Sequence, residues 1–160
     1  NATARIDLSF SQSTLATSLQ AAGRPAEAAA LFRDALNLRL NLLEIDPANA
    51  WYRESLWFPL LSLIRIHFSA GDGPALRASV EELARLAVRF PPPPYAQATL
   101  LFMQAELLEQ QRGRENACAT WNEARLSFET IPPASRSQFL YSAPLEMRLA
   151  ACRAIPSAGH

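Results

Sequence analysis

Apolar residues recur along the chain at the spacing of helical faces. One stripe of alanine, leucine, phenylalanine and isoleucine runs from Ala28 to Ile45, with members three, four and seven residues apart. A second stripe runs from Leu76 to Ala87, and a third from Ala117 to Ile131. Residues at these separations share one face of a helix, so each stripe predicts an amphipathic α-helix. No alternating stretch is long enough to predict a strand.

Glycine and proline divide the stripes into about seven helices. Gly-Arg-Pro at 23–25, Gly-Asp-Gly-Pro at 71–74 and Gly113 predict tight turns, in which glycine closes one helix and proline opens the next. Further prolines at 47, 91–94 and 132–133 end helices, because proline has no amide to donate. The predicted helices span 4–22, 25–46, 50–70, 74–90, 95–112, 114–131 and a broken last segment, 135–155.

Two prolines fall inside predicted helices. Pro59 cannot donate to the carbonyl of Ser55, so the third helix is expected to start late or to kink there. Pro144 is expected to split the last segment, with Ser142 capping its second piece.

The helices recur in pairs. Arg5 and Arg53, like Gly23 and Gly71, are 48 residues apart, and Leu76 precedes Ala117 by 41. Helix pairs that recur at such intervals predict a solenoid, in which each hairpin buries its apolar face against its neighbours.

The residues at these positions resemble the tetratricopeptide repeat (TPR) family. That repeat carries alanine, an aromatic residue four positions later and another alanine three positions further on. The matching residues are Ala28, Phe32 and Ala35 in one unit and Ala117, Trp121 and Ala124 in another, with Ala16 and Ala105 twelve residues before each aromatic motif begins. The middle unit is degenerate, with Leu76, Val80 and Leu83 at the signature positions. The period exceeds the usual length of about 34 residues, as in a long-repeat bacterial variant.

The resemblance implies an all-α, right-handed α-solenoid of stacked helical hairpins. Its units are about 4–48, 50–92 and 95–132, with a partial C-terminal unit, 134–155. We expect one domain over 1–160, as a fragment of a larger protein. HEAT-like repeats, whose period is about 40–47 residues, are the alternative fold.

Composition narrows the classes of function. The chain has 160 residues, of which 49% are hydrophobic and 19% charged, and its formal net charge is zero. A folded domain is expected, and a nucleic-acid partner is not, because such modules carry a basic excess. The most apolar stretch, Leu56 to Phe68, is shorter than the roughly 20 residues of a membrane-spanning helix. A cytoplasmic location is the default expectation.

Chemistry-bearing residues are few. His67 is interpreted as a hydrogen-bonded packing residue, and Cys118 and Cys152 as buried thiols that behave as small hydrophobes. The acidic pairs Glu81–Glu82 and Glu106/Glu109 are interpreted as solvated surface charge. The sequence holds no phosphate-binding glycine loop, nucleophile motif or metal-ligand motif. We therefore expect neither an enzyme nor a metal or cofactor.

The predicted function is a protein-interaction module of a bacterial signalling or regulatory protein. In the TPR family, the first helices of the hairpins line a concave groove that binds a peptide or helix. Those positions are Ser13, Thr17 and Gln20 in the first unit; Phe58, Leu61, Arg65 and Phe68 in the second; and Phe102, Glu106 and Glu109 in the third. A pairing of Arg65 with Glu106 across the groove is the structural alternative to partner binding by these two residues.

Other readings stay open. The chain could be a self-assembly domain, or an intramolecular regulatory domain that masks an effector domain of its own chain. Small-molecule sensing between helices is a third possibility. The aromatic junction at Trp51 and Tyr52 is expected to seal a joint between repeats, and it would anchor a partner if exposed. The oligomeric state is not determined by these residues.

Overall fold

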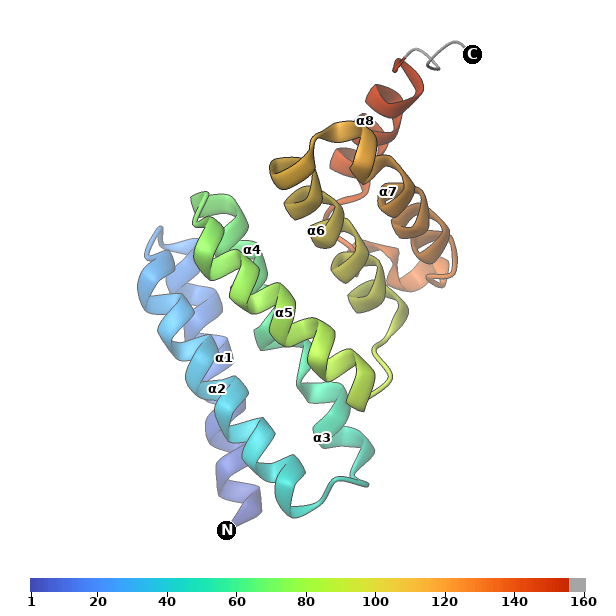
Figure 1. The fold of residues 1–160 in the computed structure, drawn as a ribbon. Coiled ribbons are helices and arrows are strands. Elements are labelled where there is room, and N and C mark those ends of the chain that lie inside the picture. The colour runs from blue at the N-terminus through green and yellow to red at the C-terminus, as the bar shows by residue number, and fades with distance from the viewer. Residues whose placement is uncertain (156–160) are drawn as a thin grey trace. The chain divides into compact units, whose positions relative to one another are not determined.

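The computed structural model describes residues 1–155, and this part of the chain is entirely helical (Figure 1). It contains eight α-helices and one 3-10 helix, and no strand. Their bounds are α1 (Ala2–Ala21), α2 (Pro25–Ile45), α3 (Ala50–Ser55), α4 (Trp57–Ala70), α5 (Gly73–Arg89), α6 (Pro94–Arg112), α7 (Arg114–Glu129), η1 (Pro133–Gln138) and α8 (Ser142–Arg153). The predicted all-α class and paired hairpins are confirmed.

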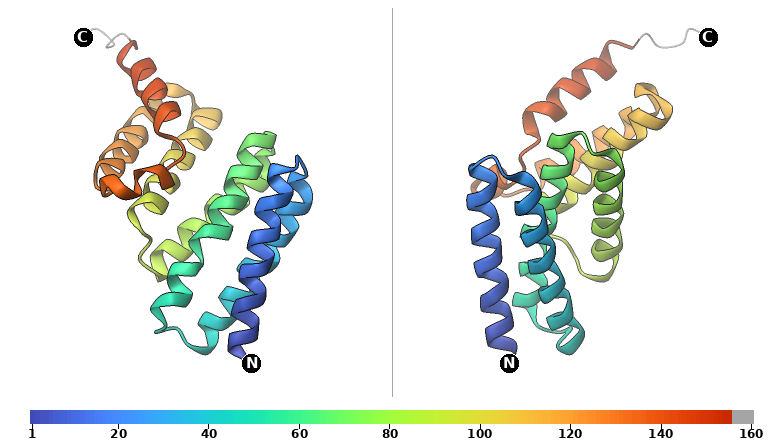
Figure 2. Two further views of the ribbon diagram at one scale, coloured as in Figure 1. Left: turned by 180° about the vertical axis from the view of Figure 1, so that it is seen from behind. Right: turned by 90° about the vertical axis from the view of Figure 1, so that its left-hand side faces the viewer.

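The chain forms two compact units, whose boundary falls inside α5, between Leu83 and Ala84. The helices α1 and α2 form a hairpin in the first unit, and α6 and α7 form one in the second. Figure 2 shows both hairpins from two further directions.

The first hairpin is closed by small residues. Ala16 on α1 and Ala28 and Ala35 on α2 are fully buried, so the two backbones approach closely. Phe32 is also fully buried, and its aromatic ring fills the space that these small side chains leave. The turn between the helices places Gly23 at a φ of 75°, where a side chain would be strained. The predicted core role of the A-x3-F stripe is confirmed.

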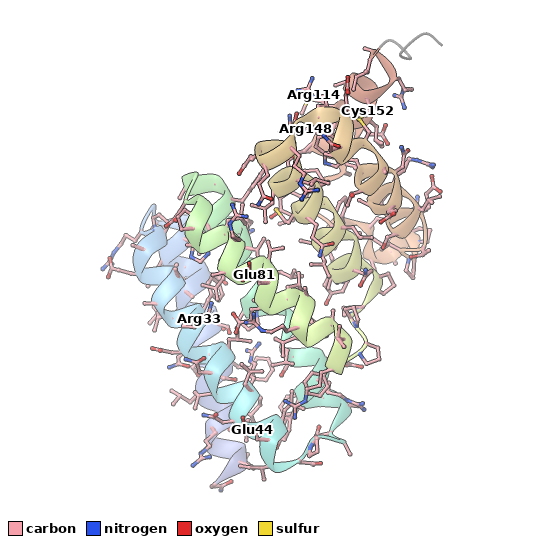
Figure 3. The ribbon with its side chains drawn as sticks, in the orientation of Figure 1. Arg33, Glu44, Glu81, Arg114, Arg148 and Cys152 are labelled. Atoms are coloured by element: carbon pink, nitrogen blue, oxygen red, sulfur yellow. A yellow bond between two sulfur atoms is a disulfide. The ribbon has the colours of Figure 1, made fainter. Side chains whose placement is uncertain are left out.

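The third predicted helix is divided at Leu56 into α3 and α4. Pro59 is the third residue of α4, and it cannot supply the amide that the Ser55 carbonyl would accept in a continuous helix. The division expected at Pro59 is confirmed. Polar contacts between α5 and other helices of this unit include an ion pair of Arg33 on α2 with Glu82 at 2.6 Å, and a contact of 3.1 Å between His67 Nδ1 and the Ser79 hydroxyl. Arg33 is labelled in Figure 3.

The second unit repeats the first hairpin's packing. Ala105 on α6 and Ala117, Trp121 and Ala124 on α7 are fully buried, as the signature predicts. The segment after α7 folds back onto α6, where Tyr141 stacks on Phe102 with ring centroids 5.0 Å apart. Leu145 and Leu149 of α8 are buried.

The last segment is broken as Pro144 predicts, into η1 and α8. The expected capping residue is wrong, however. The N-cap of α8 is Tyr141, it makes no side-chain capping bond, and Ser142 is the first residue of the helix. Pro144 is thus the third residue of α8, as Pro59 is of α4.

Candidate functional site

Two half-exposed phenylalanines line a groove in the first unit. Phe10 on α1 is 40% exposed and Phe58 on α4 is 52% exposed. The groove has a volume of about 430 Å³, and its remaining lining residues are Ser13, Thr14, Thr17 and Ser18 of α1. We call it the α1–α4 groove. Both helices run side by side in the first unit (Figure 2).

The two rings are held from behind by other aromatic residues. Phe10 stacks on Trp51, with ring centroids 5.5 Å apart, and Trp51 is itself 51% exposed. Phe58 meets the buried Phe32 edge to face at 5.8 Å. The expected anchor at Trp51 and the expected groove residue Phe58 are therefore linked through Phe10. Aromatic rings fixed in this way lose little entropy when a partner covers them.

The hydroxyl groups of the groove already donate their hydrogens. Each donates to the backbone carbonyl four residues earlier on α1, over 2.9–3.2 Å. Thr14, Thr17 and Ser18 keep oxygen lone pairs that can accept a further hydrogen bond, because a hydroxyl has one donor and two acceptor positions, whereas the Ser13 oxygen already accepts from Arg39. The wall formed by α1 is thus an acceptor surface between apolar rings.

A cation lies beyond these residues along both helices. Arg65 is two turns past Phe58 on α4, and its Nη2 donates to the Gln20 side-chain oxygen of α1 at 2.7 Å. The Arg65 Nε is buried and has no hydrogen-bond partner. Within the first unit, residues 1–83, no carboxylate lies within ion-pair distance of Arg65. A carboxylate placed against the Arg65 guanidinium would neutralise its charge.

A second cation is buried beneath Phe10. Arg39 of α2 is 1% exposed, and its guanidinium carbon lies 4.6 Å from the centre of the Phe10 ring. It donates to the hydroxyls of Ser9 and Ser13 at 3.1 and 2.9 Å. Burial lowers the pKa of Arg39 to about 10, so the group stays protonated at neutral pH. Sequence analysis missed this residue, although it interrupts the apolar stripe of α2.

Arg39 also supplies the hydrogen bond that Pro59 cannot make. Its Nη1 donates to the carbonyl of Ser55, the residue four positions before Pro59. An orphaned carbonyl in this interior would cost stability, so the arginine stabilises the break between α3 and α4. The break is close to Phe58, the second residue of α4. Arg39 therefore contacts the structure behind both walls of the groove.

The predicted partner-binding residues fall in both units. On α4, Phe58 lines the groove, Arg65 lies outside its lining and bonds to Gln20, and Leu61 and Phe68 are half-buried. Of the α1 positions, Ser13 and Thr17 line the same groove and Gln20 binds Arg65. Phe10, Thr14 and Ser18 complete it.

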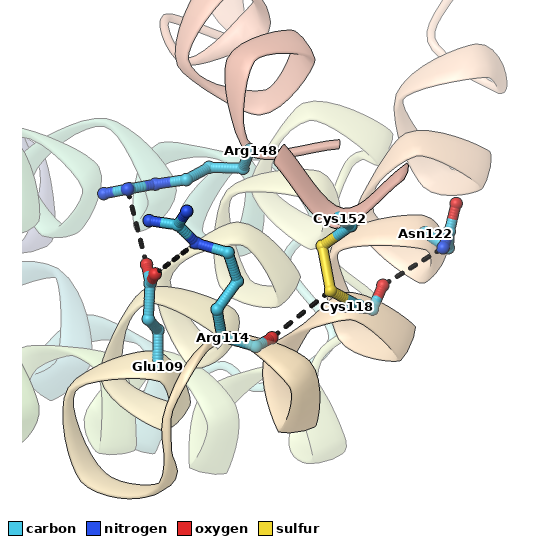
Figure 4. Close-up of a disulfide and its surroundings, with 6 residues drawn as sticks. All are labelled: Glu109, Arg114, Cys118, Asn122, Arg148 and Cys152. Carbon is cyan, nitrogen blue, oxygen red and sulfur yellow. Dashed lines mark hydrogen bonds and ion pairs between the residues drawn. A yellow bond between two sulfur atoms is a disulfide. The ribbon is translucent and has the colours of Figure 1, made fainter. Parts of the chain in front are cut away.

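The α6 residues make internal contacts in the second unit. Phe102 is fully buried against Tyr141. Glu106 is 4% exposed, so its interpretation as solvated surface charge is wrong. It accepts two hydrogen bonds from Arg148 of α8, at 2.7 and 2.9 Å, and these raise the pKa of Arg148. Glu109 pairs with Arg114 at 2.8 Å and with Arg148 at 3.4 Å (Figure 4). The partner of Glu106 is thus Arg148, within the second unit.

The two cysteines correct another expectation. Cys118 of α7 and Cys152 of α8 form a disulfide, so they are not free thiols, and both are half-buried rather than buried (Figure 4). The sequence analysis interpreted them as two separate thiols. A single disulfide requires only that two packed helices place one cysteine each at the same point of their interface.

The remaining candidate residue, His67, makes a structural contact within the described part of the chain. His67 is half-buried beside Ser79, as expected, and burial lowers its pKa. Within residues 1–155, no cluster of three acidic, histidine or cysteine residues could hold a metal ion. No helix in the same range is both long and apolar enough to cross a membrane.

Comparison with protein-family models, with curated proteins and with solved structures finds no match to this chain. The functional argument therefore depends on the groove's own residues.

Proposed function

We propose that the chain is a protein-interaction domain that binds a helix or peptide of a partner protein in the α1–α4 groove. One observation carries this proposal: Phe10 and Phe58 line one groove and remain 40% and 52% exposed, and Trp51, which stacks on Phe10, is 51% exposed. Exposed aromatics that are fixed from behind are typical energetic anchors of interfaces.

The charge of the groove selects the partner's chemistry. Between Leu8 and Ala22, α1 and its cap carry no charged residue, and Arg65 brings a cation with an unused donor. The partner is an amphipathic segment whose apolar side chains cover Phe10 and Phe58 and whose carboxylate reaches Arg65.

We further propose that the hairpins are TPR-type repeats of an α-solenoid within a larger bacterial signalling or regulatory protein. The buried alanine–aromatic–alanine signature around Phe32 and Trp121 supports this reading. The residues of α6 that a continuous solenoid groove would use are engaged within the second unit. For that reason the proposed binding site is confined to α1 and α4.

The disulfide changes the proposed location. Disulfides persist in oxidising compartments and are rare in the cytoplasm, where thiol systems reduce them. We propose that the chain works outside the reducing cytoplasm, in place of the cytoplasmic location that the sequence suggests. Alkylation of the protein as it is extracted from its source cells, followed by mass spectrometry, tests this: alkylated Cys118 and Cys152, which must have been free thiols, would contradict it.

A random-peptide display selection on the purified chain tests the groove. We expect selected peptides to combine apolar residues with an acidic one, and calorimetry to show about tenfold or greater loss of affinity in Phe58→Ser. The Arg65→Glu variant is expected to reject acidic peptides and to accept the same peptides with lysine in the acidic position. Leu126→Ser is the matched control, because Leu126 is 54% exposed on α7. Affinity unchanged by Phe58→Ser and Arg65→Glu in folded protein would contradict the proposal.

Self-assembly remains the second candidate, and one observation favours it. Leu8 and Leu15 lie seven residues apart on α1 and are 50% and 52% exposed. Such a pair could meet the same pair of a second copy. Light scattering at several concentrations separates the candidates, because self-assembly predicts a mass that rises with concentration and falls in Leu15→Gln.

A further inference from the structure

The disulfide is accessible from a pocket of the second unit. Cys118 and Cys152 line a pocket of about 520 Å³ together with Asn122, Arg125, Leu149 and Arg153. We propose that this disulfide is a reducible clasp: a small anionic thiol enters the pocket, cleaves the bond and thereby releases α8 from α7.

The pocket's charge favours an anionic thiol. Arg125 and Arg153 both contribute to its lining. Arg125 is already paired with Glu129, whereas no carboxylate of residues 1–155 lies within ion-pair distance of Arg153. Guanidinium groups beside a disulfide attract an anionic reductant and stabilise the thiolate that attacks. A disulfide buried in a closed core could not be reached by a thiol in this way.

The exchange proceeds in two steps that balance. The thiolate of the reductant attacks Sγ of Cys152, a new S–S bond forms, and the electron pair of the old bond leaves on Sγ of Cys118. That sulfur takes a proton from water. In the disulfide form it lies 3.2 Å from the carbonyl oxygen of Arg114, which can accept the hydrogen of the new thiol. A second thiolate attacks the mixed disulfide and frees Cys152. Two molecules of thiol are oxidised to their disulfide, and the protein disulfide is reduced to two thiols.

Reduction leaves α8 with few attachments. The helix has 12 residues, which is too short to be stable alone in water. Its remaining contacts include the buried Leu145 and Leu149, and the ion pairs of Arg148 with Glu106 and Glu109. Arg148 also lies over the Trp121 ring, at 5.6 Å. Release of α8 therefore uncovers Trp121 and leaves the Glu106 carboxylate without its partner, which makes the second unit responsive to thiols.

The first experiment tests the approach of the thiol. Reduction of the full chain is timed with 2-sulfanylethanesulfonate, which is anionic, and with 2-aminoethanethiol, which is cationic, by alkylation and mass spectrometry. The double variant Arg125→Gln, Arg153→Gln is expected to slow the anionic thiol about tenfold relative to the cationic one. Arg85→Gln is the control, because Arg85 is exposed on α5 and absent from the pocket lining. Equal effects of the double variant on both thiols would overturn the proposed site.

The second experiment tests the release of α8. Hydrogen exchange of the oxidised and reduced wild-type chain is compared by mass spectrometry, so that no substitution can confuse the result. Reduction is expected to speed amide exchange in residues 145–153 about tenfold or more, while exchange in the α1–α2 hairpin stays unchanged. Protection of α8 that is the same in both states would overturn the clasp. The Cys118→Ser, Cys152→Ser variant is expected to reproduce the reduced state.

Discussion

The bond between Arg39 and the Ser55 carbonyl predicts a coupling between Arg39 and Pro59. In a continuous helix, the residue at position 59 would donate its amide to that carbonyl, and Pro59 has none. Arg39 supplies the donor instead, although the two residues belong to different helices. If this account is right, the stability that Arg39 contributes depends on Pro59. Alanine at position 59 supplies an amide of its own, so Pro59→Ala should reduce the stability that is lost when Arg39 is removed.

The magnitude follows from what each substitution removes. Arg39→Met keeps most of the side-chain volume, but it leaves the Ser55 carbonyl without a donor, at a cost of about 1–3 kcal/mol. Loss of the contact with the Phe10 ring adds about 0.5–1 kcal/mol, and relief of the buried charge offsets part of the total. We expect Arg39→Met to lower the free energy of unfolding by about 1–3 kcal/mol. The Ser9 and Ser13 hydroxyls keep their own bonds to backbone carbonyls.

A double-mutant cycle then isolates the coupling. In the wild type, Pro59→Ala removes buried apolar surface and should destabilise the chain by about 1 kcal/mol. In the Arg39→Met background, the new amide of residue 59 can bond to the Ser55 carbonyl and recover about 1–2 kcal/mol. Urea denaturation followed by circular dichroism measures all four chains, with the disulfide intact and the slope of each transition compared.

A matched proline provides the control for this cycle. Pro144 is the third residue of α8, as Pro59 is of α4, and it lies in the second unit. The effects of Pro144→Ala and Arg39→Met should therefore add within about 0.5 kcal/mol. A cost of Pro59→Ala that is the same with and without Arg39 would refute the reasoning, because the arginine would then not serve the proline's carbonyl.

Three further predictions concern buried groups. Trp121→Ala should lower the free energy of unfolding by about 3–5 kcal/mol, measured by thermal or urea denaturation, because its ring is fully buried; a change below about 1 kcal/mol would contradict its place in the core. Glu106→Gln should cost about 2–3 kcal/mol by the same assay, since it removes the buried partner of Arg148, and a double-mutant cycle with Arg148→Met should show the two losses to be non-additive. His67, which faces Ser79, Asp72 and Arg33, has a pKa below its usual 6.5, mainly through burial. Below pH 6.5 the unfolded chain thus binds more protons than the folded chain, so stability should fall from pH 7.5 to 5.5, and His67→Gln should fall less over that interval.

Much of the fold follows from local chemistry that sequence alone displays. Helix ends were predictable because Gly23, Gly71 and Gly113 take positive φ values at turns, and because prolines interrupt backbone hydrogen bonding. The apolar stripe predicted on α2 is buried at Ala28 and Phe32, but its predicted end at Ile45 is not buried. Ile45 is 68% exposed, because it is the last residue of α2 and the buried face turns to Leu42 and Leu43.

The groove and the clasp depend on distant parts of the chain, and local patterns predict them only in part. The resemblance to the TPR family singled out Ser13, Thr17 and Phe58, whereas Phe10, which lines the same groove and stacks on Trp51, is not among the positions it implies. The disulfide was missed because its two cysteines are 34 residues apart, and they meet only after η1 reverses the chain before α8. Helical spacing does not determine that reversal.

The buried arginine did leave a signal, and the signal explains how such residues can be found. Polar residues interrupt the apolar face of α1 at Ser9 and Ser13, and Arg39 interrupts the matching face of α2. A single interruption is costly in a core, but interruptions on two packed helices can satisfy one another. Pro59 adds an acceptor without a donor to the third helix. Three separate anomalies on three helices, each unfavourable alone, therefore predict one hydrogen-bonded cluster, and here that cluster lies directly beneath Phe10.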